Sequence, residues 1–108
     1  MIINKTPHAI NIVDEDGNVI QGFLPVGEPA RVKTKITKLP YVIDGIPLVT
    51  VEVDQASVVG LPEVAEGVYY IVSQMVYDAL SERSDLLVPA DLVRDAGGNI
   101  IGCRAFTI

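Results

Sequence analysis

The chain has 108 residues, of which 49% are hydrophobic and 20% charged, with a net charge of −6 at pH 7. This length fits a single domain over residues 1–108, and so apolar a composition excludes an intrinsically disordered chain. The charge disfavours binding to duplex nucleic acid, because neutralising phosphates needs clustered Lys and Arg.

Most of the chain has the pattern of short β-strands separated by turns. Segments rich in β-branched residues alternate with runs of Gly, Asn, Asp and Pro, which favour turns. In chain order, the predicted strands are 9–13, 19–24, 30–39, 41–43, 46–53, 57–61, 68–72, 86–89 and the two strands of a last hairpin that runs from 92 to 106. Turns at 14–18, 44–45 and 95–99 close three hairpins.

One helix is predicted, directly after the continuous apolar run 68–72, which is typical of a central strand. Ser73 has the side chain of a helix N-cap, and apolar residues fall on one face of the segment 74–82 that follows. We therefore expect a mainly β fold: a small twisted antiparallel sheet or partly open barrel of six to eight strands, with one short helix at about 74–82.

The apolar composition also bears on assembly and location. A chain this small buries only about two-thirds of the surface that it exposes when unfolded, so we expect a homo-oligomer to cover part of its apolar surface. The single cysteine, Cys103, favours a reducing compartment. Because no basic leader and no membrane-length apolar run is visible, we expect a cytoplasmic protein, in the host cytoplasm if a virus encodes it.

Two local patterns each have two explanations. The segment 14–20 resembles 95–101, which indicates either a duplicated half-domain or, as we favour, the same hairpin turn used twice. Four basic residues, Arg31, Lys33, Lys35 and Lys38, form a stripe along the strand 30–39. Such a stripe is either a solvated strand face, which we favour, or a docking surface.

Recognisable catalytic and metal-binding motifs are missing from the sequence. His8 is the only histidine, so a hydrolase would have to use it, and no Gly-x-Ser-x-Gly motif accompanies it. Cys103 lies in an apolar strand, where a small buried residue is the expected role. One His and one Cys without ligand spacing predict no metal site, and we expect no cofactor.

Three arginines in the last quarter of the chain are candidate anion ligands. Each can instead brace a loop, as Arg83 with Asp85 and Arg94 with Asp95. In the binding interpretation, Arg83, Arg94 and the helix start at Ser73 line one pocket, with tyrosines stacking on a base. The candidate ligand-binding residues are Thr6, His8, Tyr70, Ser73, Arg83, Asp85, Arg94 and Arg104.

The motifs together resemble a known group of proteins. They are Thr6-Pro7-His8-Ala9-Ile10, Leu61-Pro62, Tyr70-Ile71-Val72-Ser73, Arg83-Ser84-Asp85-Leu86, Val93-Arg94-Asp95 and Ile101-Gly102-Cys103. The pattern resembles a family of small uncharacterised proteins of bacteriophages, prophages and their bacterial hosts, although residues 26–38 match it little. The resemblance implies a phage setting rather than a reaction.

From this setting we expect a non-enzymatic ligand-binding protein of phage origin that sequesters a nucleotide-derived immune signal and so counters host defence. The first alternative is a protein–protein interaction module that inhibits a host protein, docking through the strand 31–38 or a sheet edge. The second alternative is a small hydrolase that uses His8. We expect neither duplex nucleic acid nor a membrane among its partners.

Overall fold

The fold is mainly β, as predicted, with one short helix. The computed structural model describes residues 1–108, except for the side chains of residues 53–57. In chain order the elements are β1 (Ile2–Asn4), β2 (Ile10–Val13), β3 (Val19–Phe23), β4 (Arg31–Ile43), β5 (Ile46–Val59), β6 (Tyr69–Ile71), α1 (Gln74–Ala79), β7 (Leu86–Arg94) and β8 (Ile100–Thr107).

Six strands form a nearly closed, barrel-like sheet in the order β1-β6-β7-β8-β2-β3. The prediction of a small antiparallel sheet or partly open barrel is confirmed: β2–β3, β7–β8 and β4–β5 are antiparallel hairpins, although within the barrel-like sheet β1 with β6, β6 with β7 and β2 with β8 are parallel. The strands β4 and β5 and the helix α1 lie between these parallel partners in the chain and form part of the long crossovers that parallel pairing needs. A bridge from Asn4 to Pro25 links the two edges of the sheet.

The Asn4 side chain holds the sheet closed at this bridge. It is 1% exposed, and its Nδ2 donates to the carbonyl oxygens of His8 at 2.7 Å and Phe23 at 2.9 Å. Its Oδ1 accepts from the Thr6 backbone N–H at 2.9 Å and the Thr6 hydroxyl at 2.7 Å. The carboxamide thereby joins β1 to the loop after it and to the end of β3. Neither β1 nor this role of Asn4 was predicted from the sequence.

The core lies between β6, β7, the helix and the base of β4. Its buried residues are Ala30, Val32, Tyr70, Val72, Val76, Leu86 and Val88. The helix begins as predicted, since the Ser73 hydroxyl accepts from the Val76 N–H. It ends three residues earlier than predicted, because Leu80 leaves the helical conformation and a turn to Arg83 follows.

The two similar segments, 14–20 and 95–101, form the same hairpin turn. In each turn, the Oδ1 atom of the first aspartate accepts hydrogen bonds from two backbone N–H groups. Asp14 accepts from Asp16 and Asn18. Asp95 accepts from Gly97 and Asn99. These bonds favour the ionised carboxylates and lower the pKa of both aspartates. Local turn chemistry therefore accounts for the internal similarity.

The strands β4 and β5 form a separate two-stranded sheet, which we call the arm; the rest of the chain is the body. The predicted strands 30–39 and 41–43 are one strand here, and the predicted Asp44-Gly45 turn joins it to β5. The structure does not describe the side chains at two predicted strand ends, residue 53 of the strand 46–53 and residue 57 of the strand 57–61.

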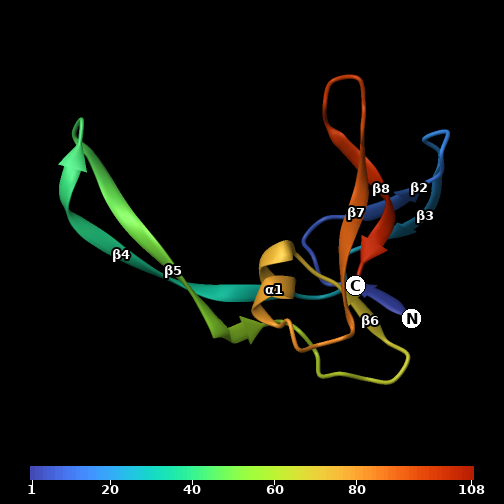
Figure 1. Cartoon of the computed structure of the whole chain (residues 1–108), viewed down its shortest axis with the longest axis horizontal. Helices are drawn as coiled ribbons and strands as arrows, with labels where there is room; N and C mark the ends of the chain where they lie inside the picture. Colours follow the sequence, from blue (N-terminus) through green and yellow to red (C-terminus); the bar gives the residue numbers. More distant parts are fainter.

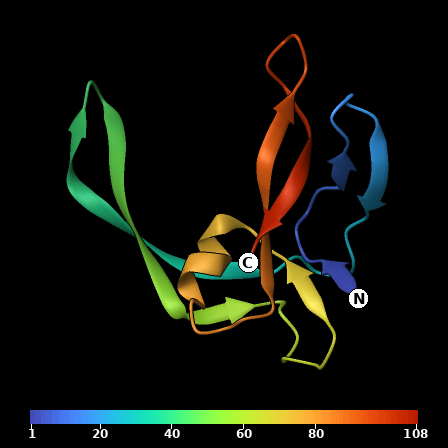
Figure 2. The same cartoon turned by 45° about the vertical axis from the view of Figure 1, so that its right-hand side comes forward.

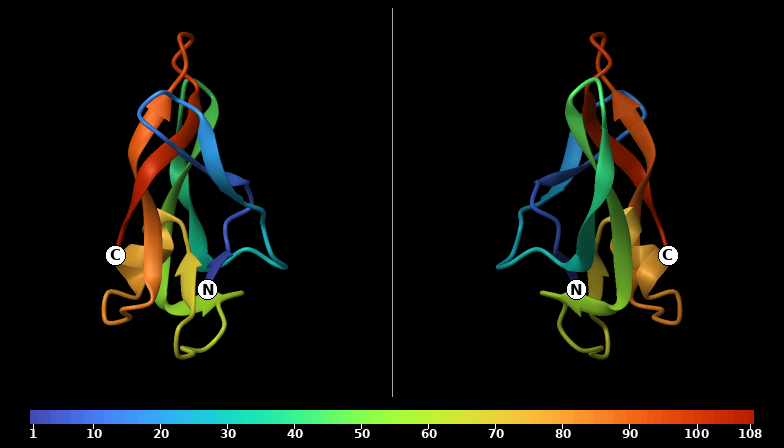
Figure 3. Two further views of the ribbon diagram at one scale, coloured as in Figure 1. Left: turned by 90° about the vertical axis from the view of Figure 1, so that its right-hand side faces the viewer. Right: turned by 90° about the vertical axis from the view of Figure 1, so that its left-hand side faces the viewer.

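The arm projects far from the body (Figure 1). The radius of gyration is 17.1 Å, whereas a compact domain of this length has about 13 Å. The tips of the arm, of β2–β3 and of β7–β8 all point to the same side, and the helix and both termini lie toward the opposite side (Figures 1 and 2). Seen along its long axis, the molecule is narrow (Figure 3), with overall extents of 51 × 39 × 22 Å.

Candidate functional site

Arg83 forms an internal brace with Asp85, one of the two roles that the sequence allowed. Its Nε and Nη2 donate to the two carboxylate oxygens of Asp85 at 2.8 and 2.6 Å, and its Nη1 donates to the Pro62 carbonyl at 3.1 Å. The guanidinium also lies 5.9 Å from the centre of the Tyr70 ring. Its hydrogen-bonding capacity is thus largely used within the chain, at the loop that leads into β7.

This brace predicts a specific dependence of stability on pH. The hydrogen bonds from Arg83 lower the pKa of Asp85 in the folded chain, so the pair stabilises the fold above the unfolded pKa of about 3.9 and loses this contribution as the pH falls through the lower folded value. We expect Asp85→Asn to cost about 2 kcal/mol at pH 7 and less at pH 2 in urea unfolding. The control is Glu82→Gln at a neighbouring exposed carboxylate; an equal loss at both pH values would contradict the brace.

The single anion pocket predicted from Arg83, Arg94 and Ser73 is not formed. Arg83 precedes β7 and Arg94 ends it, so the eight strand residues from Leu86 to Val93, about 26 Å of extended chain, lie between them. Arg94 donates from Nη1 to the Gly98 carbonyl at 2.8 Å and so braces the β7–β8 turn, although not through Asp95 as the sequence analysis proposed. Ser73 caps the helix. The sequence analysis treated 86–89 and 92 onward as separate pieces and therefore missed this separation.

The remaining candidates are spread over the body. The Nη1 atom of Arg104 lies 3.9 Å from the Oδ1 atom of Asp91, which is a loose ion pair between exposed side chains. The Thr6 hydroxyl donates to Asn4 and to the His8 carbonyl, so it supports the loop after β1. His8 is exposed, and its carbonyl oxygen accepts hydrogen bonds from the Asn4 and Thr6 side chains.

Cys103 has the environment of an inert core thiol. It is 1% exposed, and burial raises the pKa of its thiol. A raised pKa disfavours the thiolate, which is the nucleophilic form. Within the described part of the chain, no three His, Cys, Asp or Glu side chains gather into a metal-binding group. No helix over the described residues has the length and apolar character to cross a membrane.

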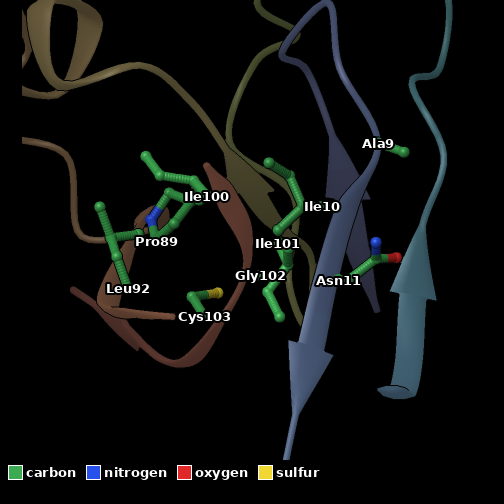
Figure 4. A pocket seen from close by; sticks show the side chains of 9 residues that line it. All are labelled: Ala9, Ile10, Asn11, Pro89, Leu92, Ile100, Ile101, Gly102 and Cys103. Carbon is green, nitrogen blue, oxygen red and sulfur yellow. The ribbon is translucent and has the colours of Figure 1, made fainter. Parts of the chain in front are cut away.

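A cavity lined mainly by apolar side chains opens where β2 and β8 separate. These two strands pair only at Ile12 and Cys103, and beside that point lies a cavity of about 160 Å³, which we call the cleft. Its lining residues come from β7, β8 and the start of β2: Ala9, Ile10, Asn11, Pro89, Leu92, Ile100, Ile101, Gly102 and Cys103. In Figure 4 the Asn11 side chain points away from Pro89 and Leu92, toward β3, so the other side chains around the cleft are apolar or small, although polar atoms also form part of its wall.

The size of the cleft limits what it can hold. Sites for drug-sized ligands have volumes of about 300–1,000 Å³, whereas an apolar cavity of about 150 Å³ accepts a group the size of benzene. The cleft therefore fits one aliphatic or aromatic group rather than a nucleotide. A larger cavity of about 430 Å³ lies at the base of the arm and is lined by Pro7, Pro29, Ala30, Arg31, Val32, Ser73 and Met75.

The arm has one polar and one apolar face. Residues paired across two strands share a face. Thr37 pairs with Thr50 and Lys35 with Glu52 on one face, whereas Ile36 pairs with Val51 and Lys38 with Val49 on the other. Ile36, Val49 and Val51 are 66%, 51% and 57% exposed. At the base of β4, before an irregularity in the pairing between Val32 and Lys33, Val32 is buried in the core.

The tip of the arm is also apolar and exposed. Tyr41, Val42, Ile43 and Ile46 flank the Asp44-Gly45 turn and are all more than half exposed. The predicted basic stripe occupies exposed positions of β4 from Arg31 to Lys38, and Lys38 lies on the apolar face opposite Val49. The sequence revealed the alternation of 30–39 and the hairpin turn, but not that the strands leave the body and expose their apolar face.

Comparisons with protein-family models, with curated proteins and with solved structures found no match to this chain.

Proposed function

We propose that this chain is a non-catalytic protein–protein interaction module and that the arm carries its binding surface. The observation that carries the proposal is the exposed apolar face of Ile36, Val49 and Val51 on a hairpin that projects from the body. A two-stranded hairpin is at best marginally stable alone in water, and an apolar sheet face normally packs against another layer. The apolar face of the arm is therefore a binding surface that a partner protein would bury.

Sequestering a nucleotide receives less support. The predicted phosphate contacts came from Arg83 and Arg94, and both side chains donate to acceptors within the chain. A hydrolase that paired His8 with Cys103 would need an accessible thiolate, whereas Cys103 is buried with a raised pKa. A binding role also fits the resemblance to small phage-associated proteins, which commonly act on host components by binding. We place it in the cytoplasm, where its free thiol would stay reduced.

Site-specific crosslinking tests this proposal. The photoreactive residue p-benzoylphenylalanine is placed at Val51 on the apolar face or, as the matched control, at Thr50 on the polar face. Irradiation in cells of the natural host should then yield a crosslinked protein from position 51 and several-fold less from position 50. The proposal is abandoned if position 51 gives no protein crosslink, or if both positions give the same yield.

A further inference from the structure

We infer that the partner of the arm is a second copy of this chain, with the apolar face of one protomer's arm packed over the cleft of the other. This inference rests on the proposed function and names its partner. The first support is the surface area. The chain exposes 7350 Å², whereas a compact monomer of 11.6 kDa exposes about 5,800 Å². The excess of about 1,500 Å² exceeds the roughly 800 Å² that each partner buries in a stable interface.

The second support is the shape and chemistry of the cleft. Leu92, Ile100 and Ile101 lie at the cleft and are 46%, 53% and 40% exposed, so an apolar rim surrounds a cavity sized for one aliphatic or aromatic group. The arm presents groups of this size, such as Ile36 on its face and Tyr41 near its tip. An apolar projection and an apolar cavity on the same chain generate a reciprocal dimer when a two-fold axis relates the two copies.

The third support is charge. Residues 31–59, which form the arm, carry four basic and three acidic residues, whereas the rest of the chain carries four basic and eleven acidic residues. Of the four basic residues outside the arm, Lys5, Arg83 and Arg94 already donate to acceptors within the chain. Two bodies placed together would repel each other, whereas an arm laid on a body places a segment of net charge +1 against one of net charge −7, with Lys38 on the contacting face beside Val49. Electrostatic complementarity of this kind favours contact between arm and body.

The mass of the purified full chain in solution, measured by sedimentation or light scattering, tests whether the partner is a second copy. We expect a mass of at least two chains at micromolar concentration. Ile36→Thr with Val51→Thr keeps the β-branched shape of the arm while removing apolar contact, and should raise the dissociation constant about a hundredfold. The matched control on the polar face, Thr37→Ser with Thr50→Ser, should change it less than about threefold. A mass of 11.6 kDa for the unmodified chain, or no effect of the apolar pair, overturns the inference.

Mixing two variants tests whether the arm of one protomer packs over the cleft of the other. Leu92→Thr with Ile101→Thr should weaken self-association to a similar extent; Ile100→Thr, at a more exposed position, serves as a second cleft variant if that pair does not fold. A mixture of the arm variant and a cleft variant retains one intact arm and one intact cleft per dimer, so its average mass should exceed that of either variant alone. Packing of arm against arm predicts no such recovery, and that result overturns the inference.

The two proposals fail differently. If the purified chain is monomeric but position 51 crosslinks to another host protein, the arm is an interaction surface and the inference of a second copy is wrong. If the chain is monomeric and position 51 gives no crosslink, both proposals are wrong.

Discussion

Replacing Asn4 by alanine should destabilise the fold by about 3 kcal/mol, because a buried carbonyl or N–H that loses its partner costs about 1–3 kcal/mol. The carboxamide makes four hydrogen bonds, two as donor to the His8 and Phe23 carbonyls and two as acceptor from Thr6. Alanine leaves these groups without partners beside the bridge to Pro25, where the sheet edges meet. Unfolding in urea at a fixed protein concentration measures the loss.

Two further variants separate the possible causes. Asn4→Asp keeps an acceptor for Thr6 but cannot donate to the two carbonyls when ionised, so we expect it to be at least as destabilising as Asn4→Ala at pH 7. Gln21→Ala removes an exposed amide from the adjacent strand β3 and should change stability by less than about 0.5 kcal/mol. An Asn4→Ala chain within about 0.5 kcal/mol of the parent would show that the carboxamide does not hold the sheet closed.

Gly60→Ala should cost a similar amount, about 3 kcal/mol, through the base of the arm. Gly60 has φ = +81°, which disfavours any side chain, and a Cβ there would lie 2.6 Å from the Pro29 carbonyl oxygen. Because Pro29 precedes β4 and Gly60 follows β5, the clash would force apart the two chain segments from which the arm leaves the body.

A glycine at the arm tip provides the matched control. Gly45 has φ = +76°, and a Cβ there would meet nothing within 4 Å, so Gly45→Ala should cost only the conformational penalty of about 1–2 kcal/mol. The difference between the two variants in urea unfolding isolates the close approach of Gly60 to Pro29. If both substitutions cost the same, backbone conformation alone explains the loss and the base of the arm tolerates the added methyl group.

Features set by neighbouring residues could be predicted from the sequence. The Asp14 and Asp95 turns form because each aspartate accepts N–H groups within four residues of itself. Ser73 caps the helix three residues before Val76, and Arg83 reaches Asp85 two residues away. In each case both partners lie in one short segment, so residue type and spacing were enough to predict the contact.

The predicted anion pocket depended on distances between residues far apart in the chain, which local sequence patterns do not reveal. The strand β7 is continuous from Leu86 to Arg94, and this continuity separates Arg83 from Arg94. The parallel pairings of β1 with β6 and β2 with β8 join segments more than sixty residues apart, and the short β1 has no alternation that would reveal it. Asn4 and the cleft depend on these pairings, so the sequence analysis missed both.

By itself, the sequence determined that residues 30–39 form a strand with alternating faces, that a tight turn follows at Asp44-Gly45, and that the chain is too apolar to bury all of its hydrophobic residues easily. Only the tertiary structure decided that this strand leaves the sheet. An amphipathic strand has the same alternation whether its apolar face covers its own core or projects into solvent. In this chain the body covers Val32 but leaves Ile36 exposed, because the sheet closes at the Asn4–Pro25 bridge without β4 and β5.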